Sequence, residues 1–358
     1  MSSLRVNLPG REYDILSEPG ILDRAGALLR PVLPGSLAVI VTDSNVEPLY
    51  ASRLARSLLR SGFHSAILEV PAGEQSKTPE VLFELWEQMM DLGLTRSDAV
   101  LALGGGVVGD LGGFAAATIL RGVRYVQIPT TLLAQVDSSV GGKVAVDLEA
   151  GKNLAGAFYQ PRMVLMDPEV LRTLPEREFR GGMAEVIKYG CIRDAALFSK
   201  LEALGSREAV MERAEGIILR CCDIKRELVE QDERDTGARM LLNFGHTLGH
   251  VYEKAGGYAR YIHGEAVAAG MVAAARLGRL LGVTPPETEA RIAALLRTFG
   301  LPVSLPARRK DFEALARDKK ASGNTITFIA LSELGRAEPV RLETARLLEL
   351  IEEAGLCT

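Results

Sequence analysis

The stretch AVLALGGGVVGD, residues 99–110, decides the fold. Its first five residues are apolar and are typical of a strand buried on both faces of a sheet. The glycines that follow match G-x-G-x-x-G between a strand and a helix, where backbone N–H groups can approach a phosphate. The motif alone is a weak signal because it lies far from the first βα unit, and a tight strand-to-helix turn is an equal alternative.

The same alternation of strand and helix runs through the whole N-terminal half. Apolar runs at 37–43, 65–70, 125–128 and 163–166 are predicted strands, and helical patterns fall between them. After about residue 175 helical patterns dominate. We therefore predict a Rossmann-like α/β N-terminal domain with a mainly parallel sheet, residues 1–173, followed by a mostly α-helical C-terminal domain, residues 174–358.

Composition excludes several classes of partner. The 358 residues carry a net charge of −4 and a pI near 5.8, so no basic footprint points to nucleic acid. No apolar run reaches membrane-spanning length, and the first residues lack the layout of a signal peptide. The four cysteines show no C-x-x-C spacing. We expect a cytoplasmic globular protein with neither nucleic acid nor membrane as a partner.

Three of the four histidines fall within the window 237–267. His246 and His250 are four residues apart and share one face of a predicted helix, and His263 follows a Gly-Gly turn. Gathered imidazoles favour a divalent metal, most often zinc, over three separate interior histidines. Spacing leaves open which rings bind the metal and which carboxylate joins them. The candidate carboxylates are Glu185, Glu253 and Glu265.

A second region, residues 130–153, is rich in glycine, serine and threonine around Asp137, Lys143 and Lys152. Lysines beside glycines suit a phosphate or carboxylate, because the backbone can close around an anion that the ammonium neutralises. Solvated surface lysines are the alternative. Asp43, at the end of a predicted strand, is placed either to bind a ribose hydroxyl or to cap a helix.

Nine motifs together resemble the 3-dehydroquinate synthase family of sugar-phosphate cyclases along nearly the whole chain. In order they are GEQSK at 73–77, GGGVVGDLGGF at 104–114, RG at 121–122, PTTLLAQVDSSVGGK at 129–143, GKN at 151–153, GGMAEVIK at 181–188, NFGHTLGH at 243–250, HGEAVAAGM at 263–271 and DKK at 318–320. Any one motif would be weak, but the ordered set is specific.

The resemblance implies a set of site residues. Zinc, with cobalt as a possible substitute, would be held by Glu185, His246 and His263, which makes His250 a neighbour of the metal. NAD would contact Asp43, Glu74, Lys77, Gly105, Gly106, Val107, Gly109, Asp110, Thr130, Thr131, Asp137, Lys143 and Lys152. The positions that match the family's substrate-binding and catalytic residues are Arg121, Asp137, Lys143, Lys152, Asn153, Lys188, Lys225, Arg239, Asn243, His250 and Lys320, with Lys319 as the alternative to Lys320.

The resemblance also implies an activity. The family converts 3-deoxy-D-arabino-heptulosonate 7-phosphate to 3-dehydroquinate and phosphate, a lyase step of the shikimate pathway of aromatic amino-acid biosynthesis. The reaction combines transient oxidation by NAD, phosphate elimination, reduction, ring opening and an intramolecular aldol step, and the family's usual assembly is a homodimer. Two other enzyme classes remain as alternatives: a related sugar-phosphate cyclase and a metal-dependent polyol or glycerol phosphate dehydrogenase.

Overall fold

The computed structural model describes residues 1–313, 315 and 325–357. The chain forms two compact units, the first made of Met1–Leu174 and Ala214–Arg234, the second of Pro175–Arg213 and Asp235–Thr358. The sequence-based division after residue 173 differs from this in one segment, the helix α8 (Ala214–Gln231). That helix packs on β1 (Ser2–Val6) and η5 (Ala134–Ser138) of the first unit, and the Cys222 thiol donates to the carbonyl oxygen of Gln135 in η5.

The first unit is built on a seven-stranded sheet in the order β1-β2-β9-β6-β5-β3-β4. Only β1 and β2 pair antiparallel; the other neighbours are parallel, as the strand and helix alternation predicts. The strands are β1 (Ser2–Val6), β2 (Tyr13–Ser17), β3 (Leu37–Asp43), β4 (His64–Val70), β5 (Ala99–Gly104), β6 (Arg124–Pro129) and β9 (Met163–Met166).

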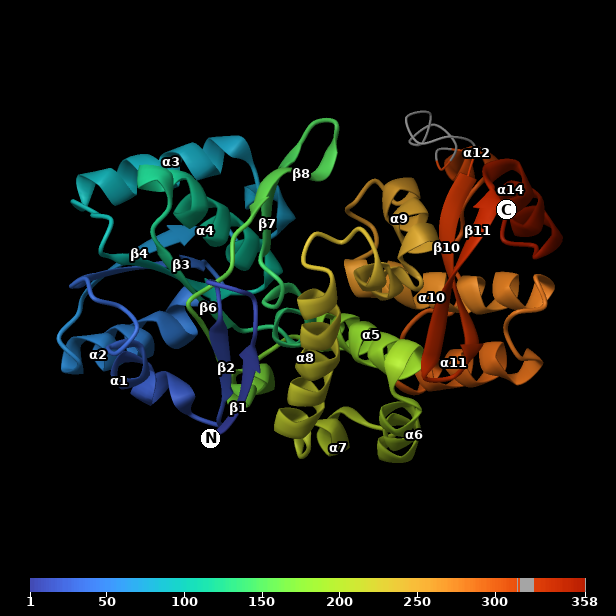
Figure 1. Cartoon of the computed structure of the whole chain (residues 1–358), viewed down its shortest axis with the longest axis horizontal. Coiled ribbons are helices and arrows are strands. Elements are labelled where there is room, and N and C mark those ends of the chain that lie inside the picture. Colours follow the sequence, from blue (N-terminus) through green and yellow to red (C-terminus); the bar gives the residue numbers. More distant parts are fainter. Residues whose placement is uncertain (314, 316–324, 358) are drawn as a thin grey trace. The chain divides into compact units, whose positions relative to one another are not determined.

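Helices cover both faces of this sheet, with α1 and α2 on one side and α3 and α4 on the other (Figure 1). Alternate residues of β3 show that both faces of the sheet are apolar and must be buried by helices. Ala38 and Ile40 point into one buried cluster, and Val39 and Val41 into the other. The helical segments of the unit are η1 (Ile21–Arg24), α1 (Ala25–Leu29), η2 (Glu47–Ala51), α2 (Ser52–Arg60), η3 (Glu74–Ser76), α3 (Pro79–Asp91), α4 (Gly106–Thr118), η4 (Ile119–Arg121), η5 (Ala134–Ser138), η6 (Pro168–Arg172) and α8.

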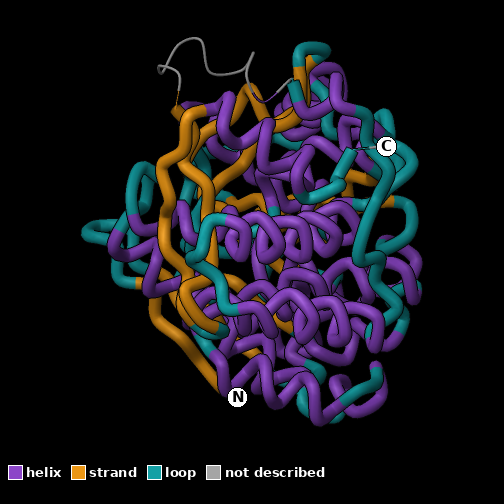
Figure 2. Tube along the Cα trace, turned by 90° about the vertical axis from the view of Figure 1, so that its right-hand side faces the viewer, coloured by secondary structure: helices purple, strands orange, loops and turns teal. Residues whose placement is uncertain are grey.

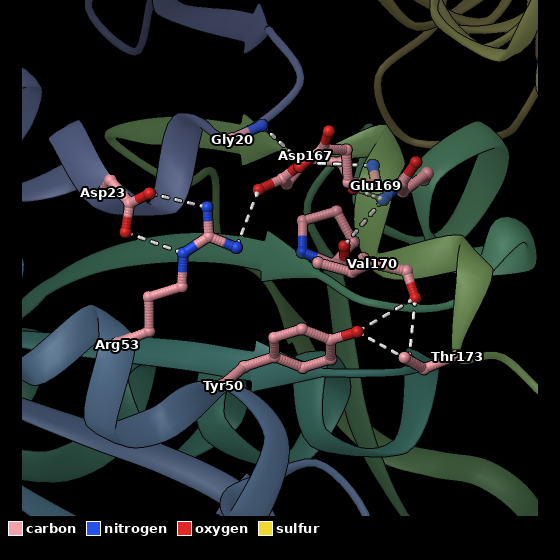
Figure 3. A network of polar contacts seen from close by, with 10 residues as sticks. Gly20, Asp23, Tyr50, Arg53, Asp167, Glu169, Val170 and Thr173 are labelled. Carbon is pink, nitrogen blue, oxygen red and sulfur yellow. Dashed lines mark hydrogen bonds and ion pairs between the residues drawn. The ribbon is translucent and has the colours of Figure 1, made fainter.

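A polar network ties the end of β9 to the helices on one face (Figure 3). Asp167 follows β9, is 1% exposed, and accepts hydrogen bonds from the backbone N–H groups of Gly20 and Glu169. Arg53 forms a two-point ion pair with Asp23, at 2.7 and 2.8 Å, and its Nη1 lies 3.9 Å from Asp167. Burial raises the pKa of Asp167. The network fixes η1 and α2 against the carboxyl edge of the sheet.

A separate hairpin, β7 (Lys143–Leu148) with β8 (Gly151–Phe158), lies beside α4 in the first unit (Figure 1). No strand was predicted from the sequence in residues 130–153, the region rich in glycine, serine and threonine around Lys143 and Lys152. Lys143 instead begins β7, and Lys152 and Asn153 lie on β8. Asn153 has a φ of 58°, a left-handed conformation that asparagine tolerates better than most residues.

Helices make up most of the second unit, as predicted, and β10 and β11 form a two-stranded antiparallel sheet in it (Figure 2). Its elements are α5 (Glu176–Arg193), α6 (Ala195–Leu204), α7 (Arg207–Met211), η7 (Ala238–Asn243), α9 (His246–Ala255), α10 (His263–Leu280), α11 (Pro286–Thr298), α12 (Arg309–Phe312), β10 (Thr325–Glu333), β11 (Arg336–Glu343) and α14 (Thr344–Glu353).

Within the described parts of the chain, none of the helices combines the length and apolar character needed to cross a membrane.

Candidate metal centre and nucleotide loop

Three helices of the second unit bring Glu185, His246 and His263 together. Glu185 lies in the middle of α5, and the two histidines are the first residues of α9 and α10. The Nε2 atoms of both histidines lie 3.5 Å from Oε1 of Glu185. A tetrahedral ion with ligand bonds of about 2.0–2.2 Å separates its ligand atoms by about 3.3–3.6 Å. Both histidines therefore stand at the distance from the carboxylate that a zinc-type ion requires, and the three ligand atoms all lie within 4.8 Å of one another.

The outer nitrogens of the two imidazoles are held in place. Nδ1 of His246 lies 3.2 Å from the carbonyl oxygen of Phe244, and Nδ1 of His263 lies 3.3 Å from Oε1 of Glu253. Both partners are acceptors, so each Nδ1 carries a proton, and each Nε2 would offer its lone pair to an ion that displaces the remaining proton of the cluster. Two nitrogens and one carboxylate oxygen form a donor set typical of catalytic zinc.

Close glycine contacts explain how the helices that carry the ligands approach one another. Gly264 follows His263, and a Cβ added there would lie 2.1 Å from the carbonyl oxygen of Gly181 on α5. On α10, a Cβ at Gly270 would lie 2.0 Å from the carbonyl oxygen of Gly245, just before α9. No side chain fits at either crossing, so α10 sits directly against both neighbours and the three ligands converge.

The electrostatics of the cluster also suit a cation. Glu185 is 0% exposed and forms an ion pair with Lys188, one turn along α5 and 1% exposed. Burial lowers the pKa of His246 to about 3. Burial acts on His263 in the same direction, but its contacts with Glu185 and Glu253 outweigh it and raise the pKa to about 10. Without metal, the raised pKa of His263 means that this imidazole keeps a proton, and its positive charge balances the nearby carboxylates. A divalent ion would supply that positive charge instead.

Three further residues that were predicted to bind substrate, Arg239, Asn243 and His250, lie on η7 and α9. Arg239 is buried and Asn243 exposed, both on the short helix that precedes His246. The side chain of His250 is 63% exposed and its ring centroid lies 5.7 Å from that of His246. Glu265 instead pairs with Arg177, at 2.7 Å. Lys320, like its alternative Lys319, lies outside the described residues.

In the first unit, the glycine motif sits where the sequence analysis expected it, between β5 and the start of α4. Gly105 precedes the helix without a side-chain cap, so the first N–H groups of α4 remain available at the carboxyl edge of the sheet. A Cβ at Gly105 would lie 2.9 Å from Thr131, and one at Gly106 would lie 3.3 Å from Ser138. This is the geometry that admits a phosphate at a helix N-terminus.

Charged residues that the sequence analysis assigned to NAD or substrate gather beside this loop. The ammonium of Lys77, 4% exposed, lies 2.5 Å from Asp110 and also donates to Asn153. Burial opposes its charge, but Asp110 outweighs burial and raises the pKa of Lys77. Lys152 lies 3.3 Å from Glu74. These contacts join the start of α3, α4 and the hairpin around the glycine loop.

A second charged pair joins α8 to η5. The ammonium of Lys225, 6% exposed, lies 2.6 Å from the Asp137 carboxylate and donates to its backbone carbonyl. The hydroxyl of Thr131 accepts from the N–H of Ala134, and Thr130 is buried at the end of β6. Lys225, predicted to be in the helical domain, is therefore a residue of the first unit.

Asp43 and Arg121, which were also predicted to bind NAD or substrate, make none of the contacts described above beside the glycine loop. Asp43 ends β3 and accepts from the N–H groups of Asn45 and Val46 in the turn that follows, whereas the next helical segment has Val46 as its N-cap and no side-chain cap. The ribose contact of Asp43 stays a prediction. Arg121 is exposed beyond the far end of α4, about 20 Å along the helix axis from the glycine loop. Residues 120–122 all have positive φ values, of 50°, 66° and 110°.

An open parallel sheet with a glycine loop at its carboxyl edge, together with a His₂Glu centre in a helical unit, defines a metal-dependent enzyme with a dinucleotide-type fold. The chain belongs to the 3-dehydroquinate synthase family: residues 67–181 match the family described as 3-dehydroquinate synthase N-terminal, and residues 182–321 match 3-dehydroquinate synthase C-terminal. It is 49% identical over 355 residues to the 3-dehydroquinate synthase of Pelobacter propionicus, covering 98% of this chain and 99% of that one.

Two solved structures have the same fold throughout. One is a 2-deoxy-scyllo-inosose synthase complexed with carbaglucose-6-phosphate, NAD⁺ and Co²⁺, 26% identical, with a TM-score of 0.88 over 98% of this chain and 100% of that one. The other is ValA, a 2-epi-5-epi-valiolone synthase from Streptomyces hygroscopicus with NAD⁺ and Zn²⁺ bound, 29% identical, with a TM-score of 0.86 over 99% of both chains.

Two features of the site were missed by the sequence analysis. Glu253 was considered there only as a possible metal ligand, yet it contacts the outer nitrogen of His263. The glycine crossings at Gly181–Gly264 and Gly245–Gly270 had no expected role. These glycine contacts could hardly be predicted, because a glycine in the sequence does not indicate which other helix packs against it.

Proposed function

We propose that this chain converts 3-deoxy-D-arabino-heptulosonate 7-phosphate to 3-dehydroquinate and inorganic phosphate, as a lyase of the shikimate pathway. The observation that carries the proposal is the His₂Glu centre of Glu185, His246 and His263, found complete in a chain that is 49% identical along its length to a 3-dehydroquinate synthase. A cytoplasmic location goes with this biosynthetic role.

NAD and a divalent ion, zinc or cobalt, are the proposed cofactors. The related cyclases were solved with NAD⁺ and Co²⁺ or Zn²⁺, and the donor set and the loop before α4 fit both groups. The loop Gly105–Asp110 would hold the pyrophosphate, and Glu185, His246 and His263 the ion. When bound, NAD would accept and return a hydride and the ion would supply Lewis acidity at a substrate oxygen.

The chain's own residues would bind, orient and move protons. Lys152, Lys225 and Arg239 are cations suited to the carboxylate and phosphate of the substrate, and fixing those remote anions positions the reacting carbons. Lys188 would keep the buried Glu185 charged through their ion pair. His250 has an exposed imidazole close to His246 and would carry protons between substrate and water.

Product identification separates this proposal from its rival within the cyclases. Purified chain with NAD and zinc should release phosphate and 3-dehydroquinate in equal amounts from the heptulosonate phosphate. Glucose 6-phosphate, which resembles the ligand of the 2-deoxy-scyllo-inosose synthase structure, should yield no phosphate above the rate without enzyme. Turnover of glucose 6-phosphate in place of the heptulosonate would assign the chain to the related cyclases.

We also propose that the enzyme works as a homodimer in which Arg121 serves the partner's site. Arg121 is exposed at the amino-terminal edge of the sheet, and the glycine loop lies at the carboxyl edge, so its own loop is out of reach of the side chain. Leu120 and Arg121 itself both have positive φ values, a conformational cost that functional sites commonly hold.

Mixing two inactive variants tests this arrangement. Arg121→Ala and His246→Ala homodimers should each lose activity, and subunit exchange should restore roughly a quarter of the wild-type activity, because each mixed dimer regains one intact site. Activity of the mixture is measured after exchange at low protein concentration. No recovery would place Arg121 in its own subunit's site, and full activity of Arg121→Ala alone would remove it from the site altogether.

A further inference from the structure

We propose that Glu253 is a positioning residue that holds the imidazole of His263 for the metal and links that ligand to His250. This proposal rests on the metal centre of the proposed function and adds a residue to it. Glu253 lies on α9 and is 5% exposed. Its two carboxylate oxygens face two different histidines, which no ordinary surface glutamate does.

The contact with His263 sets the ring nitrogen that faces the metal. Oε1 of Glu253 lies 3.3 Å from Nδ1, while Nε2 of the same ring lies 3.5 Å from Oε1 of Glu185. A carboxylate at Nδ1 keeps the proton on that nitrogen, fixes the ring plane and raises the electron density of Nε2. His263 is the first residue of α10, and Glu253 meets it at the ring nitrogen opposite Glu185, so this carboxylate helps to set the orientation of the ring.

The second oxygen faces His250. Oε2 of Glu253 lies 3.9 Å from Nε2 of His250, one turn earlier on α9, and the His250 side chain is 63% exposed. Glu253 therefore lies between a half-buried proposed metal ligand, His263, and the more exposed imidazole of His250. The other two local carboxylates do not share this position, because Glu185 lies at the centre itself and Glu265 is held by Arg177.

Glu253 is better described as a support of the centre than as a ligand in it. Glu185, His246 and His263 already form a compact set through Oε1 and the two Nε2 atoms. Glu253 meets His263 on the opposite edge of the ring, through Nδ1, so an ion at the centre and Glu253 occupy different sides of the same imidazole. A carboxylate in that place is the usual partner of a zinc-bound histidine.

Metal affinity, measured without substrate, tests the proposal independently of the reaction. Zinc dissociation constants are obtained by competition with a chelator for wild type, Glu253→Ala and Glu253→Gln, and the visible absorption of the cobalt-loaded proteins reports ligand geometry. We expect Glu253→Ala to weaken zinc binding by about 10- to 100-fold and to change the cobalt spectrum. Glu253→Gln should lose less, since its amide oxygen still accepts from Nδ1–H. Glu265→Gln is the matched control and should keep wild-type affinity.

Melting temperatures of the metal-free proteins separate positioning from a general structural role. Zinc should raise the melting temperature of Glu253→Ala by less than it raises that of wild type, each compared with its own metal-free form. Wild-type zinc affinity and an unchanged cobalt spectrum in Glu253→Ala would overturn the proposal, as would an equal loss of stability with and without metal. A chain that binds zinc in this Glu253-dependent way but turns over no heptulosonate phosphate would contradict the proposed activity alone.

Discussion

Replacing His246 by alanine should remove the metal and nearly all activity. His246 is one of the three proposed ligands, and burial lowers the pKa of its imidazole to about 3, so its lone pair would be available for the ion. Two remaining ligands leave a site of much lower affinity. Loss of a Lewis acid worth several kcal/mol predicts a fall in kcat/KM of about a thousandfold or more. Metal analysis of the purified variant should show far less than the one ion per chain expected of wild type.

His64→Ala is the matched control for this variant. His64 is the one histidine outside the cluster, and it is exposed at the start of β4 in the first unit. Its loss should leave metal content and kcat/KM unchanged. Full metal content and activity in His246→Ala would show that the centre described here is a set of interior histidines, the alternative that the sequence left open.

Replacing Gly264 by alanine should disturb the centre without touching a ligand. The added methyl group would lie 2.1 Å from the carbonyl oxygen of Gly181 and 2.4 Å from its Cα, so α5 and α10 must separate. That movement carries His263 away from Glu185. Overpacking of this kind costs about 1–3 kcal/mol of unfolding free energy, and a ligand shift near 1 Å lowers activity by about a hundredfold. Denaturant unfolding and zinc competition measure the two effects.

Gly216→Ala on α8 is the control, because a Cβ there meets no atom within 4 Å. A helical glycine with open space around it should gain slightly in stability on becoming alanine. Unchanged zinc affinity in Gly264→Ala, with normal folding, would show that the ligands adapt to a wider helix spacing and that the glycine crossing does not set the site.

Much of the first unit could be predicted because its signals are local. The apolar run of β3 and the step from β5 into a glycine turn depend on neighbours in the chain, and the observed strands follow them. The hairpin around Lys152 was not predicted, because β8 carries two glycines together with Lys152 and Asn153 and the apolar run of β7 is short. The return of α8 to the first unit depends on tertiary packing, including the contact of Lys225 with Asp137, that no pattern along the helix reveals.

The residues of the proposed metal centre could likewise be predicted only where they are close together in the sequence. Spacing along the chain placed His246 and His263 in one window, and the structure brings them to the same carboxylate. Choosing Glu185 over Glu253 and Glu265 required the family resemblance, because Glu185 lies 61 residues before His246 and 78 before His263 and reaches the histidines only through the packing of α5 on α10. Arg121 could be assigned to a site by resemblance, yet only the fold shows that it projects from the opposite edge of the sheet.

The central claim is that the chain is a cyclase that returns its hydride, and a reaction with limiting NAD tests this most directly. The heptulosonate phosphate is supplied in large excess over NAD, with zinc present, while phosphate, 3-dehydroquinate and NADH are followed together. We predict that phosphate and 3-dehydroquinate rise in step to many times the amount of NAD, with no net NADH. NADH that accumulates in proportion to substrate consumed, with the reaction stopping when NAD is spent, would contradict the account and identify a dehydrogenase.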